Sequence, residues 1–133
     1  MPTYFDAKNN GVLDALLLSI ATRATKILLL SGYSQGQNYA TVINSVSGEA
    51  DIEFDDFDDI IDGANNSRVL RFTGIFGNAT RDNVFADTHI ALTNGVDTVL
   101  HVTDELANPV SILESNTLYF AAFNIHSMQP VAP

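Results

Sequence analysis

The fold is decided by residues 86–125, which read ADTHIALTNGVDTVLHVTDELANPVSILESNTLYFAAFNI. Two apolar runs flank a turn at Asn94 and Gly95, a second turn follows at Pro109, and a long apolar run ends the stretch. Short β-forming runs separated by turn residues at this spacing are typical of an antiparallel sandwich or barrel. The stretch predicts four strands, at residues 86–93, 98–103, 110–113 and 117–125.

The residues before this stretch predict one helix and then further strands. Apolar side chains recur every three or four residues from Leu13 to Ala24, which predicts an amphipathic helix over about 12–21. The run TKILLLS at 25–31 is short, apolar and bordered by polar residues, as in a strand that is buried on both faces. The other predicted segments are a loop at 32–38, a short helix at 39–46, a strand with one wetter face at 68–76 and a polar loop at 77–83.

These elements predict a mainly β protein. We expect an antiparallel, jelly-roll-like β-sandwich over about residues 25–126, with one N-terminal α-helix, in a single domain of residues 1–133. A chain of 133 residues is long enough to bury a continuous core without disulfides or metals.

The composition narrows the kinds of partner. Sixteen acidic residues against six basic ones give a net charge of −10, and no basic residue follows Arg81. Such a surface repels phosphate backbones, so we expect no nucleic-acid partner. The most apolar stretch, 12–30, contains Asp14, Arg23 and Lys26, which predicts that it does not span a membrane. The absence of cysteine excludes disulfides and cysteine-based zinc sites. The expected partner is protein.

An acidic stretch at residues 51–62 is the most conspicuous polar feature. Three interpretations stay open: a solvated face, a cation site, or a docking patch for a basic partner. The solvated face is favoured because Phe54, Phe57, Ile60 and Ile61 are interleaved with the acids and are expected to pack inward. A calcium loop of the Asp-x-Asp-x-Asp-Gly type is absent. The acids are Asp51, Glu53, Asp55, Asp56, Asp58, Asp59 and Asp62.

The histidines offer little chemistry. A hairpin around Asn94 and Gly95 that pairs Ile90 with Leu100 would set His89 opposite His101, within cross-strand reach. Zinc needs at least three protein ligands, and His126 is too weakly placed to be the third. Surface or interface histidines are the favoured interpretation, and we expect no metal and no other cofactor.

Nucleophilic catalysis has little support in the sequence. Residues 32–36 (GYSQG) match the Gly-x-Ser-x-Gly spelling at Ser34, but they lie in the segment predicted as a loop, and a short match of this kind is weak without the strand–turn–helix context of a nucleophile elbow. The glycines at 32–36 are also not followed by the Lys-Ser/Thr of a phosphate loop. We therefore expect that the protein is not an enzyme. Most aromatic residues lie in apolar strand patterns and are expected in the core. Tyr4, Tyr33 and Tyr39 lie in polar surroundings and are candidates for a contact surface.

The order of segments resembles small structural proteins of tailed bacteriophages. In that group a short N-terminal helix leads into an A-T-[KH]-[IL]-x-L strand, here within residues 21–30 (ATRATKILLL). A later T-H-I-A-L strand is followed by LL-x-V-T and [GN]-[ND]-T-[LV]-x-[IF]-x-A strands, here at 88–92, 99–103 and 116–121. The acidic residues 55–62 are not part of that pattern.

The resemblance implies a virion component. Such proteins are β-sandwich parts of the head, neck or tail, and we expect a capsid cement (decoration) protein on the outer surface of the capsid. Its partner would be the major capsid protein, and a homotrimer is the favoured oligomer. The alternative is a tail, neck or fibre component that binds a receptor or glycan. The expected contact residues are Tyr4, Phe5, Tyr33, Tyr39, Met128 and Pro130.

Overall fold

The computed structural model describes residues 11–64, 66–80, 89–103 and 116–128. Its elements in chain order are α1 (Val12–Arg23), β1 (Lys26–Leu30), α2 (Tyr39–Val42), the 3-10 turn η1 (Ile43–Ser45), β2 (Val46–Asp51), the 3-10 turn η2 (Phe54–Asp56), β3 (Ile61–Asp62), β4 (Ser67–Phe72), β5 (Ile75–Ala79), β6 (His89–Thr93), β7 (Val99–Val102), β8 (Thr117–Phe120) and β9 (Phe123–Met128).

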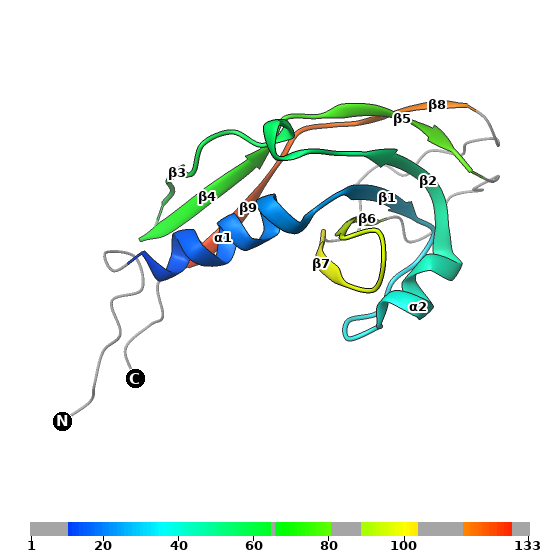
Figure 1. Cartoon of the computed structure of the whole chain (residues 1–133), viewed down its shortest axis with the longest axis horizontal. Helices are drawn as coiled ribbons and strands as arrows, with labels where there is room; N and C mark the ends of the chain where they lie inside the picture. The colour runs from blue at the N-terminus through cyan, green and yellow to red at the C-terminus, as the bar shows by residue number, and fades with distance from the viewer. Residues whose placement is uncertain (1–10, 65, 81–88, 104–115, 129–133) are drawn as a thin grey trace.

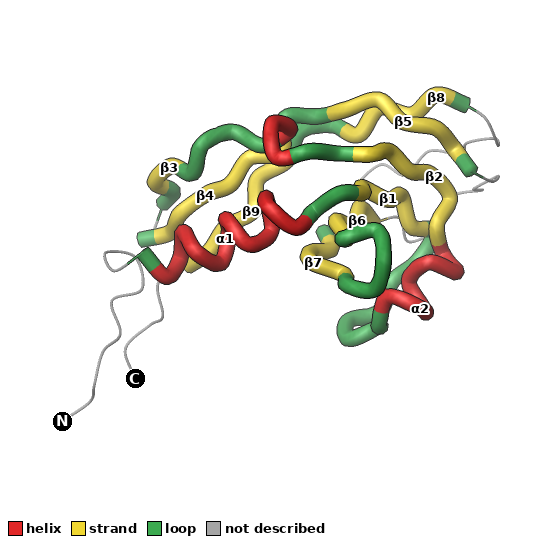
Figure 2. Tube along the Cα trace, viewed as in Figure 1, coloured by secondary structure: helices red, strands yellow, loops and turns green. Residues whose placement is uncertain are grey.

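The strands form two antiparallel sheets (Figures 1 and 2). The larger sheet has the order β7-β6-β1-β2-β5-β8, and the smaller has the order β3-β4-β9. Helix α1 lies against β4 and β9 of the smaller sheet. The predicted class, a mainly β antiparallel sandwich with one N-terminal helix, is confirmed.

One long two-stranded ribbon belongs to both sheets. The β4–β9 ladder runs from the pair Ser67–Met128 to the pair Phe72–Phe123 in the smaller sheet. The β5–β8 ladder then continues in the larger sheet from Ile75–Phe120 to Asn78–Thr117 in the same register. The ribbon therefore keeps one register as it passes from one sheet to the other, although its ladder is interrupted at the bend, and it links the two layers.

The ribbon bends at residues 73–74 and 121–122, which lie outside the strands. Gly74 has a φ of 101°, a left-handed conformation that residues with a side chain rarely adopt. A Cβ at this position would meet the Tyr119 hydroxyl and would lie 3.2 Å from the Phe120 carbonyl oxygen. Glycine is therefore required here by its conformation and by the close approach of β8.

The bend also exchanges the two faces of the ribbon. Before it, Leu70 and Phe72 are buried, whereas after it the inward positions are Ile75, Gly77 and Ala79. Phe76 therefore points outward although it lies four residues after Phe72. The strands predicted at 68–76 and 117–125 are thus each two strands in different sheets, and β5 extends into the loop predicted at 77–83.

The main core fills the space between the sheets and α1. Phe72 is fully buried at its centre, with the ring centroids of Phe57 and Phe123 at 5.7 and 5.3 Å. Leu17 and Ala21 of α1 close the core on one side. The remaining members are Ala24, Ile27, Leu29, Ala50, Ile52, Leu70, Ile90, Leu92, Phe120 and Ile125.

A second, smaller cluster covers part of the other face of the larger sheet. Leu28, Leu30 and Ala91 point away from the main core and are covered by Val42 of α2. This explains why the run at 26–30 is apolar at nearly every position: β1 is buried on both faces, as predicted. The remainder of this face, over β2, β5 and β8, carries exposed side chains.

Several local predictions are confirmed and others are wrong. The helix predicted at 12–21 extends to Arg23, and the short helix predicted at 39–46 is α2 followed by η1. Strand β2 was not predicted because VSGEAD lacks a β-forming apolar pattern; it is held between β1 and β5 by pairing on both edges. The strand predicted at 110–113 lies outside the described residues.

The predicted register of the β6–β7 hairpin is wrong. Leu92 pairs with His101 and Thr93 with Val99, because the loop spans 94–98 and the register shifts by one residue next to it. The Asn94 side-chain oxygen accepts hydrogen bonds from the backbone N–H groups of Val96, Asp97 and Thr98, at 2.9 to 3.0 Å. A single side chain thereby builds a longer loop than the Asn-Gly pair predicts.

We expect Gly74→Ala to lower the free energy of unfolding by about 2–3 kcal/mol, because it adds a clash to a strained backbone. Gly36→Ala is the matched control, since Gly36 has a φ of 90° but nothing within 4 Å of a built Cβ. It should lose only about 1 kcal/mol. Urea unfolding of both variants measures the difference, and equal losses would show that the bend does not depend on the close approach of β8.

We expect the carboxyl group of Asp97 to titrate below its usual range. The amide of Asn94 donates a hydrogen bond to it at 2.9 Å, and this bond, with a second from the Thr98 hydroxyl, lowers the pKa of Asp97. The resulting stabilisation is complete above the unfolded-state pKa of about 3.9 and is lost as the pH falls through the lower folded-state pKa.

Carboxyl ¹³C NMR titration checks this expectation. In the Asn94→Ala variant the pKa of Asp97 should rise towards the usual value. An unchanged pKa in that variant would mean that the Asn94 amide is not the main cause.

Candidate protein interface

The predicted contact residues do not gather into one surface. Tyr33 is half-buried and packs edge-on against the His89 ring, with the centroids 5.8 Å apart. Tyr39 is half-buried at the start of α2, whereas Met128 is exposed at the end of β9. Those two elements lie at opposite ends of the molecule (Figure 1). Tyr4, Phe5 and Pro130 lie outside the described residues.

Among the described residues, the two most exposed aromatic side chains belong to segments whose aromatic residues were predicted to be core. Phe76 is 70% exposed and Tyr119 is 57% exposed. They form a cross-strand pair of β5 and β8, with ring centroids 4.9 Å apart and planes tilted by 48°. The alternation predicted that Phe72 and Phe76 share a face, and only the bend at Gly74 separates them.

The exposed pair ends a row of side chains that crosses five strands. Thr93 pairs with Lys26 and Lys26 with Asp51, while Phe76 pairs with Tyr119. The β2–β5 register, extended by two residues from Glu49–Asn78, places Asp51 beside Phe76. The row therefore begins at the buried Thr93, continues through the ion pair of Lys26 and Asp51, and ends at the exposed rings of Phe76 and Tyr119.

A polar hollow of about 240 Å³ lies beside the ring of Phe76. The Lys26 ammonium lies in it, 2.9 Å from an Asp51 carboxylate oxygen and 3.8 Å from one of Glu49. The hydrogen bond to Asp51 raises the pKa of Lys26, and its partial burial opposes that rise. Two carboxylates around one ammonium leave the hollow with a net charge of −1.

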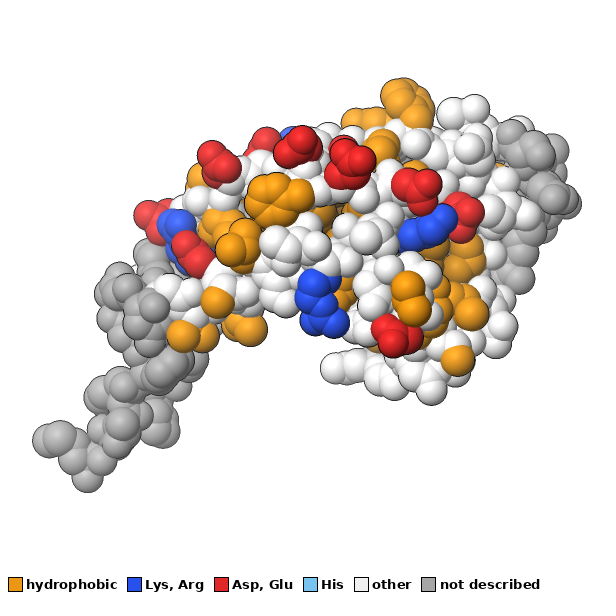
Figure 3. Space-filling view, viewed as in Figure 1, with side chains coloured by type: hydrophobic (Ala, Val, Ile, Leu, Met, Phe, Trp, Pro, Cys, Tyr) orange, Lys and Arg blue, Asp and Glu red, His pale blue; other side chains and the backbone are white. Residues whose placement is uncertain are grey.

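Carboxylates and apolar side chains alternate along one edge of the molecule (Figure 3). The acidic stretch was predicted to turn its apolar residues inward, which is correct for Phe57 but wrong for Phe54 and Ile61, which are exposed. Phe54 lies in the turn η2, in which the backbone N–H of Glu53 donates to the Asp56 carboxylate at 2.7 Å, and Ile61 lies in β3 at the edge of the smaller sheet.

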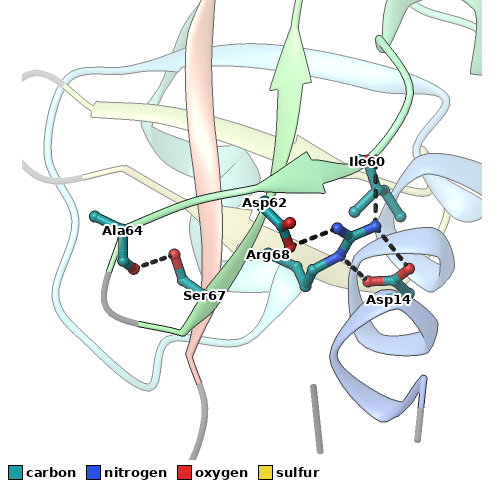
Figure 4. Close-up of polar contacts among 6 residues, drawn as sticks. All are labelled: Asp14, Ile60, Asp62, Ala64, Ser67 and Arg68. Atoms are coloured by element: carbon teal, nitrogen blue, oxygen red, sulfur yellow. Dashed lines mark hydrogen bonds and ion pairs between the residues drawn. The ribbon is translucent and has the colours of Figure 1, made fainter. Parts of the chain in front are cut away.

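The best-connected charged side chain is Arg68 on β4 (Figure 4). Its guanidinium forms two bonds to Asp14 of α1, at 2.7 and 3.1 Å, and one to Asp62 of β3, at 2.9 Å. A fourth bond reaches the Ile60 carbonyl oxygen at 3.3 Å. The hydrogen bonds to Asp14 and then Asp62 raise the pKa of Arg68. The cluster fastens α1 to the smaller sheet, so its role is structural.

An apolar groove of about 620 Å³ lies between β7 and the inner turn of the ribbon at β8 and β9. His101 and His126 line it, and His101 stacks on Phe123 with planes 13° apart. His89 points to the other face of the sheet, and its Nδ1 donates a hydrogen bond to the Thr103 carbonyl oxygen at 2.9 Å. The predicted pairing of His89 with His101 is therefore wrong.

The groove does not combine acid and base groups within the described part of the chain. No Asp or Glu is among its described lining residues. The described residues also hold no group of three His, Asp or Glu side chains that could bind a metal ion. Among the described helices, none is long and apolar enough to cross a membrane. Comparison of the chain with protein-family models, curated proteins and solved structures found no match.

We expect Asp14→Asn to destabilise the fold, because it removes the negative charge and replaces one of the two oxygens that accept hydrogen bonds from Arg68 by an NH2 donor. Asp58→Asn is the control: its partner Arg71 is 3.8 Å away, and both side chains are more than half exposed. Exposed pairs of that kind contribute little. The fall in the urea midpoint should be at least about twice as large for Asp14→Asn. Equal midpoints would show that the Arg68 cluster does not hold the helix.

Proposed function

We propose that this protein is a structural component of the virion of a tailed bacteriophage, and specifically a capsid cement protein. It would sit on the outer surface of the capsid, bind the major capsid protein and bridge adjacent capsomers. A homotrimer at the quasi-threefold positions is the favoured assembly.

The observation that carries the proposal is the exposed apolar surface of a rigid acidic scaffold. Large apolar side chains from α1, the acidic stretch and β5–β8 are exposed, including Leu16, Phe54, Phe76 and Tyr119. Scattered apolar residues are ordinary on a surface, but a ring pair on a flat sheet face supports a protein contact. The resemblance of the segment order to phage structural proteins supports a contact that is made within a virion.

The mechanism would be mechanical. Each copy would bury apolar area against two capsomers, at about 25 cal/mol per Å², and the many copies on one shell would add up. The ribbon that links both sheets suits such a role, because its two ladders keep one register across the bend between the sheets.

A tail, neck or fibre component is the second candidate. One observation favours it: Phe76, whose ring packs against that of Tyr119, lines a polar hollow, and sugars commonly stack on exposed aromatic rings beside polar groups. In that case the protein would bind a host glycan or receptor.

Co-sedimentation with capsids separates the two candidates. Purified protein should bind expanded, undecorated capsids of the encoding phage up to a fixed stoichiometry, and should raise their disruption temperature. Bovine serum albumin at equal concentration is the control for trapping in the pellet. Binding to a glycan array without capsid binding would contradict the cement proposal and support the second candidate.

A further inference from the structure

We propose that the outer face of β2, β5 and β8 binds an arginine side chain presented by a partner protein. The rings of Phe76 and Tyr119 would stack on the guanidinium, and Glu49 and Asp51 would accept its hydrogen bonds. That the partner is the capsid shell rests on the proposed function; the arginine chemistry is tested separately below.

The aromatic part of the site is preorganised. Phe76 and Tyr119 are a paired position of the β5–β8 ladder, so their spacing is set by the backbone register. The Tyr119 hydroxyl lies against Gly74, in the space that a Cβ would fill. Both rings are more than half exposed, and a guanidinium stacks on an exposed aromatic ring better than an ammonium does.

The charge of the neighbouring hollow favours a cation. Asp51 is 84% exposed and Glu49 is 43% exposed, so both carboxylates keep oxygens that face solvent. Lys26 neutralises only one of these two charges. A planar guanidinium can use the rings and the carboxylates at the same time, since its plane stacks on a ring while its N–H groups donate hydrogen bonds sideways to carboxylates.

The same face explains why an arginine is favoured over a neutral sugar. The charged groups in the hollow beside Phe76 are two carboxylates and one ammonium, so its net charge is negative, and the whole chain has a charge of −10. A partner with a positive charge gains from this field, whereas a neutral ring does not. The site thereby specifies a basic patch on the partner surface.

Peptide titration followed by ¹H–¹⁵N NMR tests the inference on the full chain. The probe is a five-residue peptide with one arginine between leucines; the controls replace arginine by lysine or by citrulline, its neutral isostere. The arginine peptide should shift amide signals of β2, β5 and β8, with an affinity about fivefold above that of the lysine peptide. The citrulline peptide should cause no saturable shift. Equal binding of the citrulline peptide, absence of shifts with the arginine peptide, or shifts of these amides by an oligosaccharide alone would overturn it.

Variants locate the site. Phe76→Ala should weaken arginine-peptide binding about fivefold, whereas Phe54→Ala removes a ring of similar exposure (52%) outside the face and should leave binding unchanged. Phe76→Leu keeps an apolar side chain and guards against a variant that fails to fold; it should lose the same binding. Equal effects of Phe54→Ala and the Phe76 variants would overturn the assignment.

Capsid binding by the same variants distinguishes this inference from the proposed function. If the wild-type protein and Phe76→Leu bind capsids equally, the face is wrong and the cement role stands. If the arginine peptide binds at Phe76 while the wild-type protein ignores capsids, the face is right and the cement role fails.

Discussion

The structure depends on one constraint: the antiparallel pairing of residues 67–78 with 117–128 keeps a single register on both sides of a bend. The pairing places β4 and β9 in one sheet and β5 and β8 in the other, so it links the two layers. The bend requires Gly74, whose left-handed backbone no β-branched or bulky residue would tolerate. The core centred on Phe72 and the exposed pair of Phe76 and Tyr119 both follow from this geometry.

Elements with strong local patterns were predictable from the sequence. The spacing of the leucines from Leu13 onward predicts a helix that is buried on one face. The apolar run of β1 predicts a strand that is buried on both faces. Strand β2 was missed because its residues pack through backbone pairing rather than through large side chains. The hairpin register was missed because one side chain, that of Asn94, reorganises five loop residues. Neither effect leaves a periodic trace in the sequence.

The exposed aromatic pair could not be predicted from the sequence. The contact residues predicted instead were Tyr4, Phe5, Tyr33, Tyr39, Met128 and Pro130. Tyr33 packs on His89, and the exposed rings come from segments that looked like core. Their exposure depends on a change of face at Gly74, and their closeness depends on pairing across 43 positions of sequence, from Phe76 to Tyr119. Contacts of that range, like Arg68 with Asp14, appear only in the folded chain.

The proposed cement role and the proposed binding face on β2, β5 and β8 together predict where the protein lies on the assembled particle and which face contacts the shell. The most direct measurement is a cryo-electron microscopy reconstruction of virions of the encoding phage. We expect a β-sandwich on the outer capsid surface at quasi-threefold positions, with Phe76 and Tyr119 against a basic side chain of the shell. Density for this protein only at the neck, tail or fibres would contradict the cement role.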